Sequence, residues 1–172
     1  MKIFLIVMAT IWLTACSSVS PRIQSAPAGD LQLKQAATNV SEFKGQTVRW
    51  GGKVIEVKNF ETHSVIQLVQ FPLNRYGRPV EDGPSQGRFF SRSADFMDPE
   101  IYQLGAMVTV VGQIIDDEAI KVDQKTLVLP VVGIEETKVW PAYNAASGRP
   151  YNPKHDWPFV GFGYYGTGSY SP

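Results

Sequence analysis

The chain has 172 residues, and its 16 basic side chains balance its 16 acidic ones, so the formal net charge at neutral pH is zero. That balance, without any run of Lys and Arg, argues against a nucleic-acid-binding protein, whose basic residues gather on one face. The only cysteine is Cys16, which excludes a disulfide within the chain and a metal site built from several cysteines.

The first fifteen residues have the parts of a signal peptide. Lys2 supplies a positive charge, and the apolar segment 3–13 contains one polar residue, Thr10. A spanning helix needs about 20 apolar residues, so this segment is too short to cross a bilayer but suits the centre of a signal peptide. The alternative, a buried helix of a cytosolic protein, is disfavoured because no polar residue gives the run an amphipathic period.

Two small residues then lead directly into Cys16. This order resembles the bacterial lipobox, which implies that residues 1–15 are removed and that Cys16 carries acyl chains such as palmitate. Because one acyl chain holds a protein on a membrane only weakly, several chains on one cysteine would make the attachment stable. The same resemblance to Gram-negative lipoproteins implies that Ser17, in place of an aspartate, directs the protein to the outer membrane, on the leaflet that faces the periplasm.

Residues 16–35 are predicted to form the lipidated cysteine and a flexible tether. This segment is rich in Ser, Pro, Ala and Gly and has no apolar period, a composition typical of linkers. A tether of this length would let the following domain sit clear of the lipid headgroups.

The next segment, residues 36–141, is predicted to be mainly β, with a first strand at 47–58. Its apolar positions change phase at Gly51-Gly52, from Val48 and Trp50 to Ile55 and Val57. A change of phase by one residue at a glycine pair is typical of a β-bulge that bends a strand. We therefore expect the first strand to bend at these glycines.

Four more strands are predicted from apolar runs, at 65–71, 88–92, 107–115 and 127–140. Between the third and fourth strands, Asp98 suits a helix N-cap and Gly105 a helix end, which predicts one short helix over 98–105. The acidic run 116–118 is expected to be a solvated hairpin tip. The order of one bent strand, two strands, a helix and two strands predicts a small five-stranded OB-like barrel.

The last segment, residues 142–172, is rich in Gly and aromatic residues and poor in aliphatic ones. Without branched apolar residues at regular spacing it is expected to be a flexible tail. The alternative is that its aromatic side chains bind a partner, a glycan or a membrane interface.

Catalytic patterns are weak in this chain. The sequence 83–87 fits G-x-S-x-G around Ser85, but a polar loop precedes it, where a nucleophile elbow needs a strand, and only His155 follows it as a base. The two histidines, His63 and His155, have no partners at metal-ligand spacing. We therefore expect no enzyme activity, no metal and no cofactor.

Several short motifs in this chain resemble those of the Slp family of Gram-negative outer-membrane lipoproteins. The most specific is Val48-Arg49-Trp50-Gly51-Gly52, and the others are Phe71-Pro72-Leu73-Asn74, Gly77-Arg78-Pro79, Phe96-Met97-Asp98-Pro99 and Val139-Trp140-Pro141. The resemblance covers roughly residues 40–141 and the lipobox. It implies an envelope location without an assigned reaction, and it carries one functional residue over, the lipidated Cys16.

Two functions are compatible with these observations. One is a structural or interaction lipoprotein that faces the periplasm, with a possible protein or glycan partner in the envelope and no nucleic-acid partner. The other is a binding module that uses the barrel face for an oligosaccharide, with Arg49, Arg88 and Arg92 as ligand-binding candidates. The aromatic residues Trp50, Phe89 and Phe90 would then either line that face or belong to the core. Convergent arginines beside an exposed ring would favour the binding module.

Overall fold

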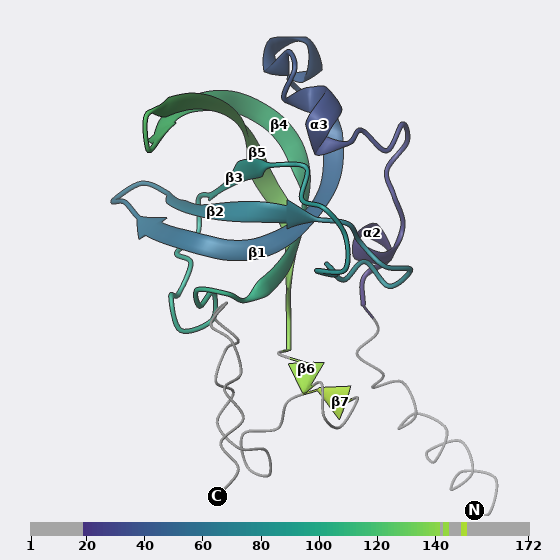
Figure 1. Cartoon of the computed structure of the whole chain (residues 1–172). Coiled ribbons are helices and arrows are strands. Elements are labelled where there is room, and N and C mark those ends of the chain that lie inside the picture. Colours follow the sequence, from purple (N-terminus) through teal and green to yellow (C-terminus); the bar gives the residue numbers. More distant parts are fainter. Residues whose placement is uncertain (1–18, 142, 145–148, 151–172) are drawn as a thin grey trace, which may run out of the picture.

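A closed barrel of five strands forms the body of the molecule (Figure 1), a computed structural model that describes residues 19–141, 143–144 and 149–150. The strands are β1 (Thr47–Asn59), β2 (Ser64–Phe71), β3 (Arg88–Ser93), β4 (Met107–Val122) and β5 (Lys125–Trp140). They pair in the order β1-β2-β3-β5-β4 and β1 closes the barrel against β4, with only β3 and β5 parallel. This is the five-stranded OB arrangement, so the predicted fold is confirmed.

The barrel interior is filled by apolar side chains that alternate with outward-facing residues along each strand. Trp50 packs edge-on against Phe89, with their ring centroids 5.3 Å apart. The Trp50 indole nitrogen donates a hydrogen bond of 2.8 Å to the Leu31 carbonyl oxygen, so the polar atom of this buried ring is satisfied. Other side chains of the same core include Val48, Val54, Ile66, Leu68, Val108, Val110, Ile114 and Val132.

The bulge of β1 lies at Ile55 and not at the glycine pair, so the predicted bulge position is wrong. Gly51 and Gly52 keep regular pairing with β2, and the register shifts only between Val54 and Glu56. Glycine is needed at these positions for a reason other than a bulge. A Cβ atom at Gly52 would lie 2.3 Å from the Val69 carbonyl oxygen, so glycine is required because the neighbouring backbone approaches closely.

Strands β4 and β5 continue beyond the barrel as a two-stranded arm, formed by residues 117–122 and 125–130 (Figure 1). The predicted hairpin tip at 116–118 is therefore wrong. These acidic residues pair within the ladder, and the chain turns later, at Asp123, whose φ is +52°. Asp116 keeps its charge paired because the Lys44 ammonium lies 2.9 Å from its carboxylate.

The segment before β1 packs on the barrel, so the predicted flexible tether is wrong for residues 19–35. It contains the short helices α2 (Pro21–Gln24) and α3 (Leu33–Ala36), and a 3-10 turn, η2 (Val40–Phe43), follows. Ile23 is only 1% exposed. The Arg49 guanidinium donates hydrogen bonds to the Ile23 and Gln24 carbonyl oxygens, at 2.9 and 2.5 Å. An isolated apolar residue in this Pro-rich segment is buried only because the segment packs on the folded barrel.

The predicted helix at 98–105 is absent, and the segment 94–106 forms turns across one end of the barrel. Asp98 begins a single helical turn, in which its carbonyl oxygen accepts hydrogen bonds from the Ile101 and Tyr102 amides. The helix does not continue because the Gly105 amide donates to the Val54 carbonyl oxygen of β1, at 2.8 Å. Met97, which is buried, closes this end of the core.

After β5 the structure describes only β6 (Tyr143–Asn144) and β7 (Arg149–Pro150), which pair with each other. The rest of the predicted tail 142–172, the signal segment 1–15 and Cys16 lie outside the described residues. Within the described ranges, no helix has the length and apolar character that a membrane span requires.

Candidate ligand-binding site

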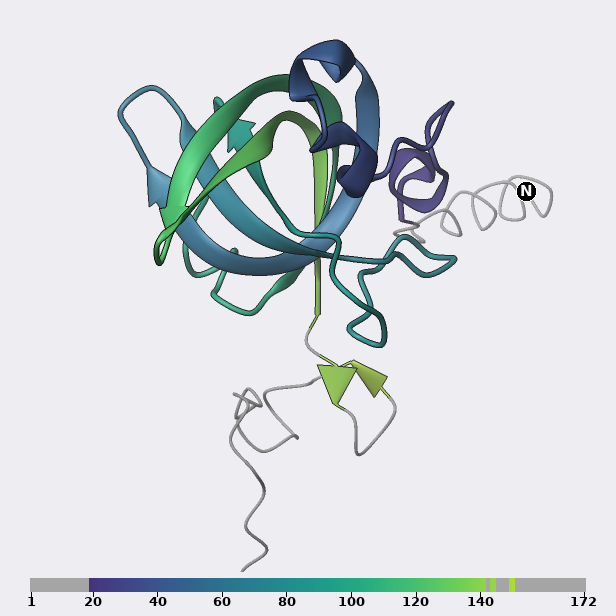
Figure 2. The same cartoon turned by 45° about the horizontal axis from the view of Figure 1, so that its top comes forward.

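A groove of about 530 Å³ lies on the outside of the barrel, between the β2–β3 face, the β1–β2 hairpin and the arm. The β2–β3 face and the β1–β2 and β4–β5 loops are the parts of an OB barrel that bind oligonucleotides and oligosaccharides. In Figures 1 and 2 the arm curves over this face beside the β1–β2 hairpin. The residues that line the groove are Glu56, Lys58, Phe60, His63, Val65, Gln67, Arg88, Phe90, Arg92 and 118, 120–123 of the arm.

The floor of the groove is apolar. Val65 and Phe90 are buried there, and together with Leu129 and Val131 they form a second hydrophobic cluster outside the barrel core. Ile120 and Leu127 of the arm pack against this cluster. Burial of apolar surface in this cluster gives the physical reason that the arm curves over the β2–β3 face and walls the groove, since an aliphatic side chain contributes up to about 1.5–3 kcal/mol when it is fully buried.

Arginine and glutamine side chains stand beside this apolar floor. Arg88, Phe90 and Arg92 alternate along β3 and therefore share one face. Gln67, opposite Phe90 in the ladder, is only 7% exposed. Its Nε2 atom and the Nε atom of Arg92 are buried, and neither has a hydrogen-bond partner among the described residues.

A buried donor without a partner costs about 1–3 kcal/mol, so native structures rarely leave one without a reason. Two such donors line the same groove. Because both atoms have almost no accessible surface, an acceptor oxygen of a bound molecule would reach them only after the two side chains turn into the groove. The groove thus has the donors that a ligand rich in oxygen atoms needs.

The rim carries an aromatic pair at the tip of the β1–β2 hairpin. The rings of Phe60 and His63 stack with their centroids 4.8 Å apart, and Phe60 is 54% exposed. The His63 Nδ1 atom lies 3.1 Å from the Thr62 hydroxyl. An exposed flat surface beside hydrogen-bond donors is suited to the apolar face of a sugar ring.

The charges of the groove are mixed. Four basic side chains line it, Lys58, Arg88, Arg92 and Lys121, and three acidic ones, Glu56, Glu118 and Asp123. Lys58 and Glu56 form an ion pair of 2.8 Å. With that pair neutralised, the two arginines on β3 are the positive charges nearest to the buried floor, which favours an anionic group in the ligand.

Of the three predicted arginines, the structure brings Arg88 and Arg92 together and places Arg49 elsewhere. Arg49 lies on β1 opposite Val111 of β4, where it holds the segment before β1 by its two carbonyl contacts. Burial at this position lowers the pKa of Arg49. Trp50 and Phe89 belong to the core, which was the second of the two positions considered for these aromatic rings. Phe90 forms part of the groove floor.

Sequence reasoning missed Gln67 and the aromatic pair. Gln67 alternates with the core residues Ile66 and Leu68, and this alternation signals an outward-facing polar residue in a strand. Phe60 and His63 gave no signal, because their position at the groove depends on the arm.

The weak catalytic candidates have structural partners. The Ser85 hydroxyl lies 3.1 Å from both the amide nitrogen and the carbonyl oxygen of Gly87, in an exposed turn. His155, its only downstream histidine, lies outside the described residues. Within the part of the chain that the structure describes, no three side chains of His, Cys, Asp or Glu gather at a spacing that could hold a metal.

The motif 48–52 has a structural explanation at each position. Val48 and Trp50 face the core, and Arg49 holds the segment before β1. A Cβ atom at Gly51 would lie 2.3 Å from the Leu73 side chain, so glycine makes room for the loop that packs on this face. The motif therefore builds the fold and does not line the groove.

Comparisons with known proteins identify a family and two relatives that are similar to this chain. The model of the Outer membrane lipoprotein Slp family matches residues 13–169. Outer membrane protein Slp of Escherichia coli (strain K12) is 30% identical over 138 residues, covering 79% of this chain and 73% of that protein. The uncharacterized lipoprotein YeaY of the same organism is 30% identical over 168 residues, covering 93% of this chain and 84% of that protein.

Solved structures match part of this chain at low TM-scores. A small single-stranded DNA-binding protein from Streptomyces coelicolor has a TM-score of 0.38 and 12% identity, covering 59% of this chain and 96% of that one. The N-terminal domain of PriB from Thermoanaerobacter tencongensis has a TM-score of 0.33 and 14% identity, covering 56% and 97%. The match to the family over most of the chain confirms the resemblance found in the sequence: this protein belongs to the outer membrane lipoprotein Slp family.

Proposed function

We propose that this protein is held on the periplasmic face of the outer membrane by acyl chains, palmitate among them, on Cys16 and acts there as a binding module without catalytic chemistry. The apolar segment and the small residues before Cys16 support the anchor, and Ser17 after it supports sorting to the outer membrane. Membership in a family of outer membrane lipoproteins supports the location.

The groove carries the proposal of a binding role. Its ligand class is an envelope oligosaccharide that bears a carboxylate or phosphate group. The observation behind this choice is the pair of arginines on β3 that line the groove, Arg88 and Arg92, together with the exposed ring of Phe60. A sugar supplies the acceptor oxygens and the apolar face, and its anionic group pairs with Arg88.

A polynucleotide is a less suitable ligand. Binding to a phosphate backbone depends on a row of basic side chains that displaces counterions. Here three carboxylates line the groove among four basic side chains. A scaffold that contacts only envelope proteins remains the alternative role, and it predicts no response to saccharides.

Two measurements test this proposal separately. Mass spectrometry of the chain purified from bacterial membranes should show acyl chains on Cys16, and Cys16→Ala should release the protein from the membrane fraction. Amide NMR spectra of the unlipidated chain should respond to added muropeptides or lipopolysaccharide core saccharides at groove residues. Spectra that stay unchanged with both saccharide classes would favour the scaffold.

A further inference from the structure

Three exposed apolar side chains lie within ten residues of one another in the segment that closes one end of the barrel. They are Phe96, Ile101 and Leu104, which we call the docking patch, and Leu104 is 73% exposed. Among the described residues, seven large hydrophobic side chains are exposed, and the docking patch contributes three of them. Exposed apolar side chains that gather in this way mark contact with a partner or a membrane, whereas scattered ones need no explanation.

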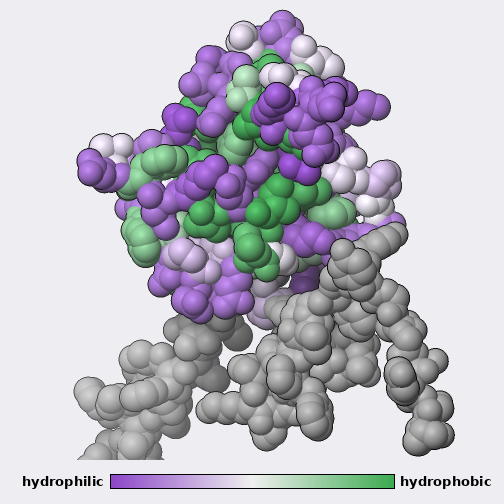
Figure 3. Space-filling model, turned by 60° about the vertical axis from the view of Figure 1, so that its left-hand side comes forward, coloured by the Kyte–Doolittle hydropathy of each residue, from purple (hydrophilic) through white to green (hydrophobic). Residues whose placement is uncertain are grey.

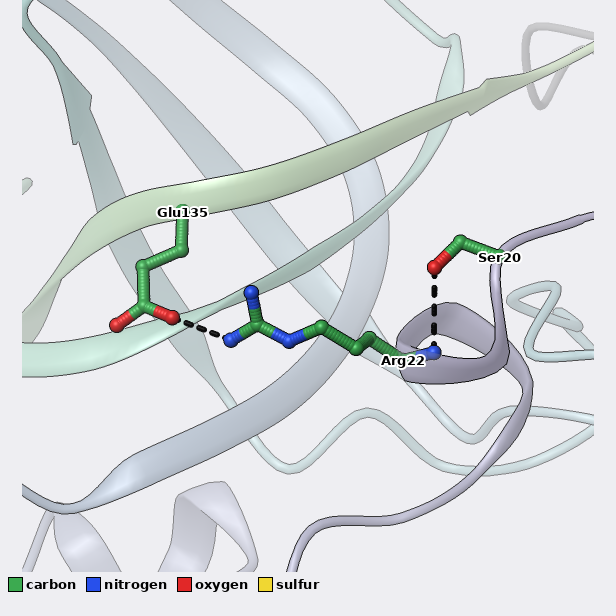
Figure 4. A network of polar contacts seen from close by, with 3 residues as sticks. All are labelled: Ser20, Arg22 and Glu135. Atoms are coloured by element: carbon green, nitrogen blue, oxygen red, sulfur yellow. Dashed lines mark hydrogen bonds and ion pairs between the residues drawn. The ribbon is translucent and has the colours of Figure 1, made fainter.

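The chain between Cys16 and the barrel is short. Ser20 caps α2 by accepting a hydrogen bond of 3.2 Å from the Arg22 amide, and the Arg22 guanidinium forms an ion pair with Glu135 of β5 (Figure 4). With Ile23 buried as well, Ser20 is fixed to the barrel. Three residues lie between it and Cys16, so the two Cα atoms are four steps apart and at most roughly 14 Å from each other in a fully extended chain. Acyl chains on Cys16 would therefore hold the barrel against the bilayer.

The segment that carries the docking patch and the chain that enters α2 both lie in the lower half of the barrel in Figure 1, the first at the left and the second at the right. On the face that Figure 3 turns forward, hydrophobic side chains lie among hydrophilic ones. The loop that packs on Ile23 through Gly77 adds Tyr76, half exposed, an amphipathic ring that suits a lipid–water interface.

We infer that the barrel docks on the phospholipid surface through Phe96, Ile101 and Leu104, beside the acyl chains. This inference rests on the proposed anchor at Cys16. The three side chains enter the interface, and the carboxylates of Asp95 and Glu100 stay among the headgroups. The β1–β2 hairpin and the arm, which line the groove, lie above the segment that carries the docking patch in Figure 1, so docking leaves the groove open to the periplasm.

The test uses the full lipidated chain in vesicles of phosphatidylethanolamine and phosphatidylglycerol. In an acylated chain Cys16 has no free thiol, so Leu104→Cys offers one site for an environment-sensitive fluorophore. Val128→Cys on the arm is the matched control, because Val128 is also an exposed aliphatic side chain, at 50%. We expect a blue shift and quenching by nitroxide lipids at position 104 and neither effect at position 128. High salt should leave the shift intact, since burial of apolar groups is not screened.

The outcomes separate docking from anchoring. The mass of each purified chain first reports whether Cys16 is acylated, and an unacylated chain would overturn the anchor and the docking with it. An acylated chain with water-like emission at position 104 would overturn the docking alone. Equal shifts at positions 104 and 128 would also overturn it, because the barrel would then have no preferred face. Loss of the shift at high salt would show an electrostatic contact in place of apolar docking.

Discussion

Replacing Ile23 with alanine tests whether the segment before β1 is part of the folded domain. The Ile23 side chain is 1% exposed, and truncation of a buried isoleucine to alanine costs about 2–5 kcal/mol. The cost should fall at the low end, about 2 kcal/mol, because α2 has only four residues and the segment can detach before the barrel unfolds.

The assay is urea unfolding of the unlipidated chain, followed by tryptophan fluorescence, to which the buried Trp50 contributes. With a denaturant slope of about 2 kcal/mol per molar urea, the midpoint should fall by about 1 M. Ile101→Ala is the matched control, because Ile101 is 57% exposed and such changes usually stay within about 0.5 kcal/mol. Trypsin should also cleave after Arg22 faster in Ile23→Ala. Midpoints and cleavage rates equal to wild type would show that residues 19–35 are a free tether after all.

Two further predictions concern the barrel. A methyl group at Gly52 would lie 2.3 Å from the Val69 carbonyl oxygen, whereas one at Gly83 would meet only a proline side chain at 3.3 Å. Gly52→Ala should therefore cost about 1–3 kcal/mol in urea unfolding, and a midpoint equal to that of Gly83→Ala would contradict this. The hydrogen bond from Lys44 lowers the pKa of Asp116. A carboxyl whose pKa is lowered by folding stabilises the fold above its unfolded pKa of about 3.9, and this contribution is lost as the pH falls through the folded value. Wild type should thus lose slightly more stability than Asp116→Asn on acidification, and parallel losses would refute the pairing.

The sequence predicts the strands and their order because alternation of apolar residues reflects local geometry. It fails where tertiary contacts decide. The glycine pair at 51 and 52 resembles a bulge, yet its cause is the close approach of β2 and of the loop around Leu73. Ile23 lies alone in a Pro-rich segment, and only the completed barrel offers it a burial site. Asp116 is acidic, but its place in the ladder follows from the apolar contacts of the arm.

The same distinction applies to the site. Arg88 and Arg92 could be predicted because both stand on one short strand at alternate positions. The sequence could not show that Arg49 lies outside the ligand site, because its partners are carbonyl oxygens of a segment more than twenty residues away in sequence. The exposed ring of Phe60 becomes part of the groove only when the arm folds over the β2–β3 face.

The binding role of the groove is tested most directly by comparing Arg88→Ala with Arg75→Ala. Arg75 lies outside the groove, where its guanidinium stacks on the exposed Tyr76 ring. Both variants and wild type would be titrated with a lipopolysaccharide core saccharide and with a muropeptide, followed by amide NMR. We expect saturable shifts around Gln67 and Phe90 for wild type and Arg75→Ala, and their loss in Arg88→Ala. Shifts that persist unchanged in Arg88→Ala, or that appear outside the groove, would contradict a ligand site between the arm and the β2–β3 face.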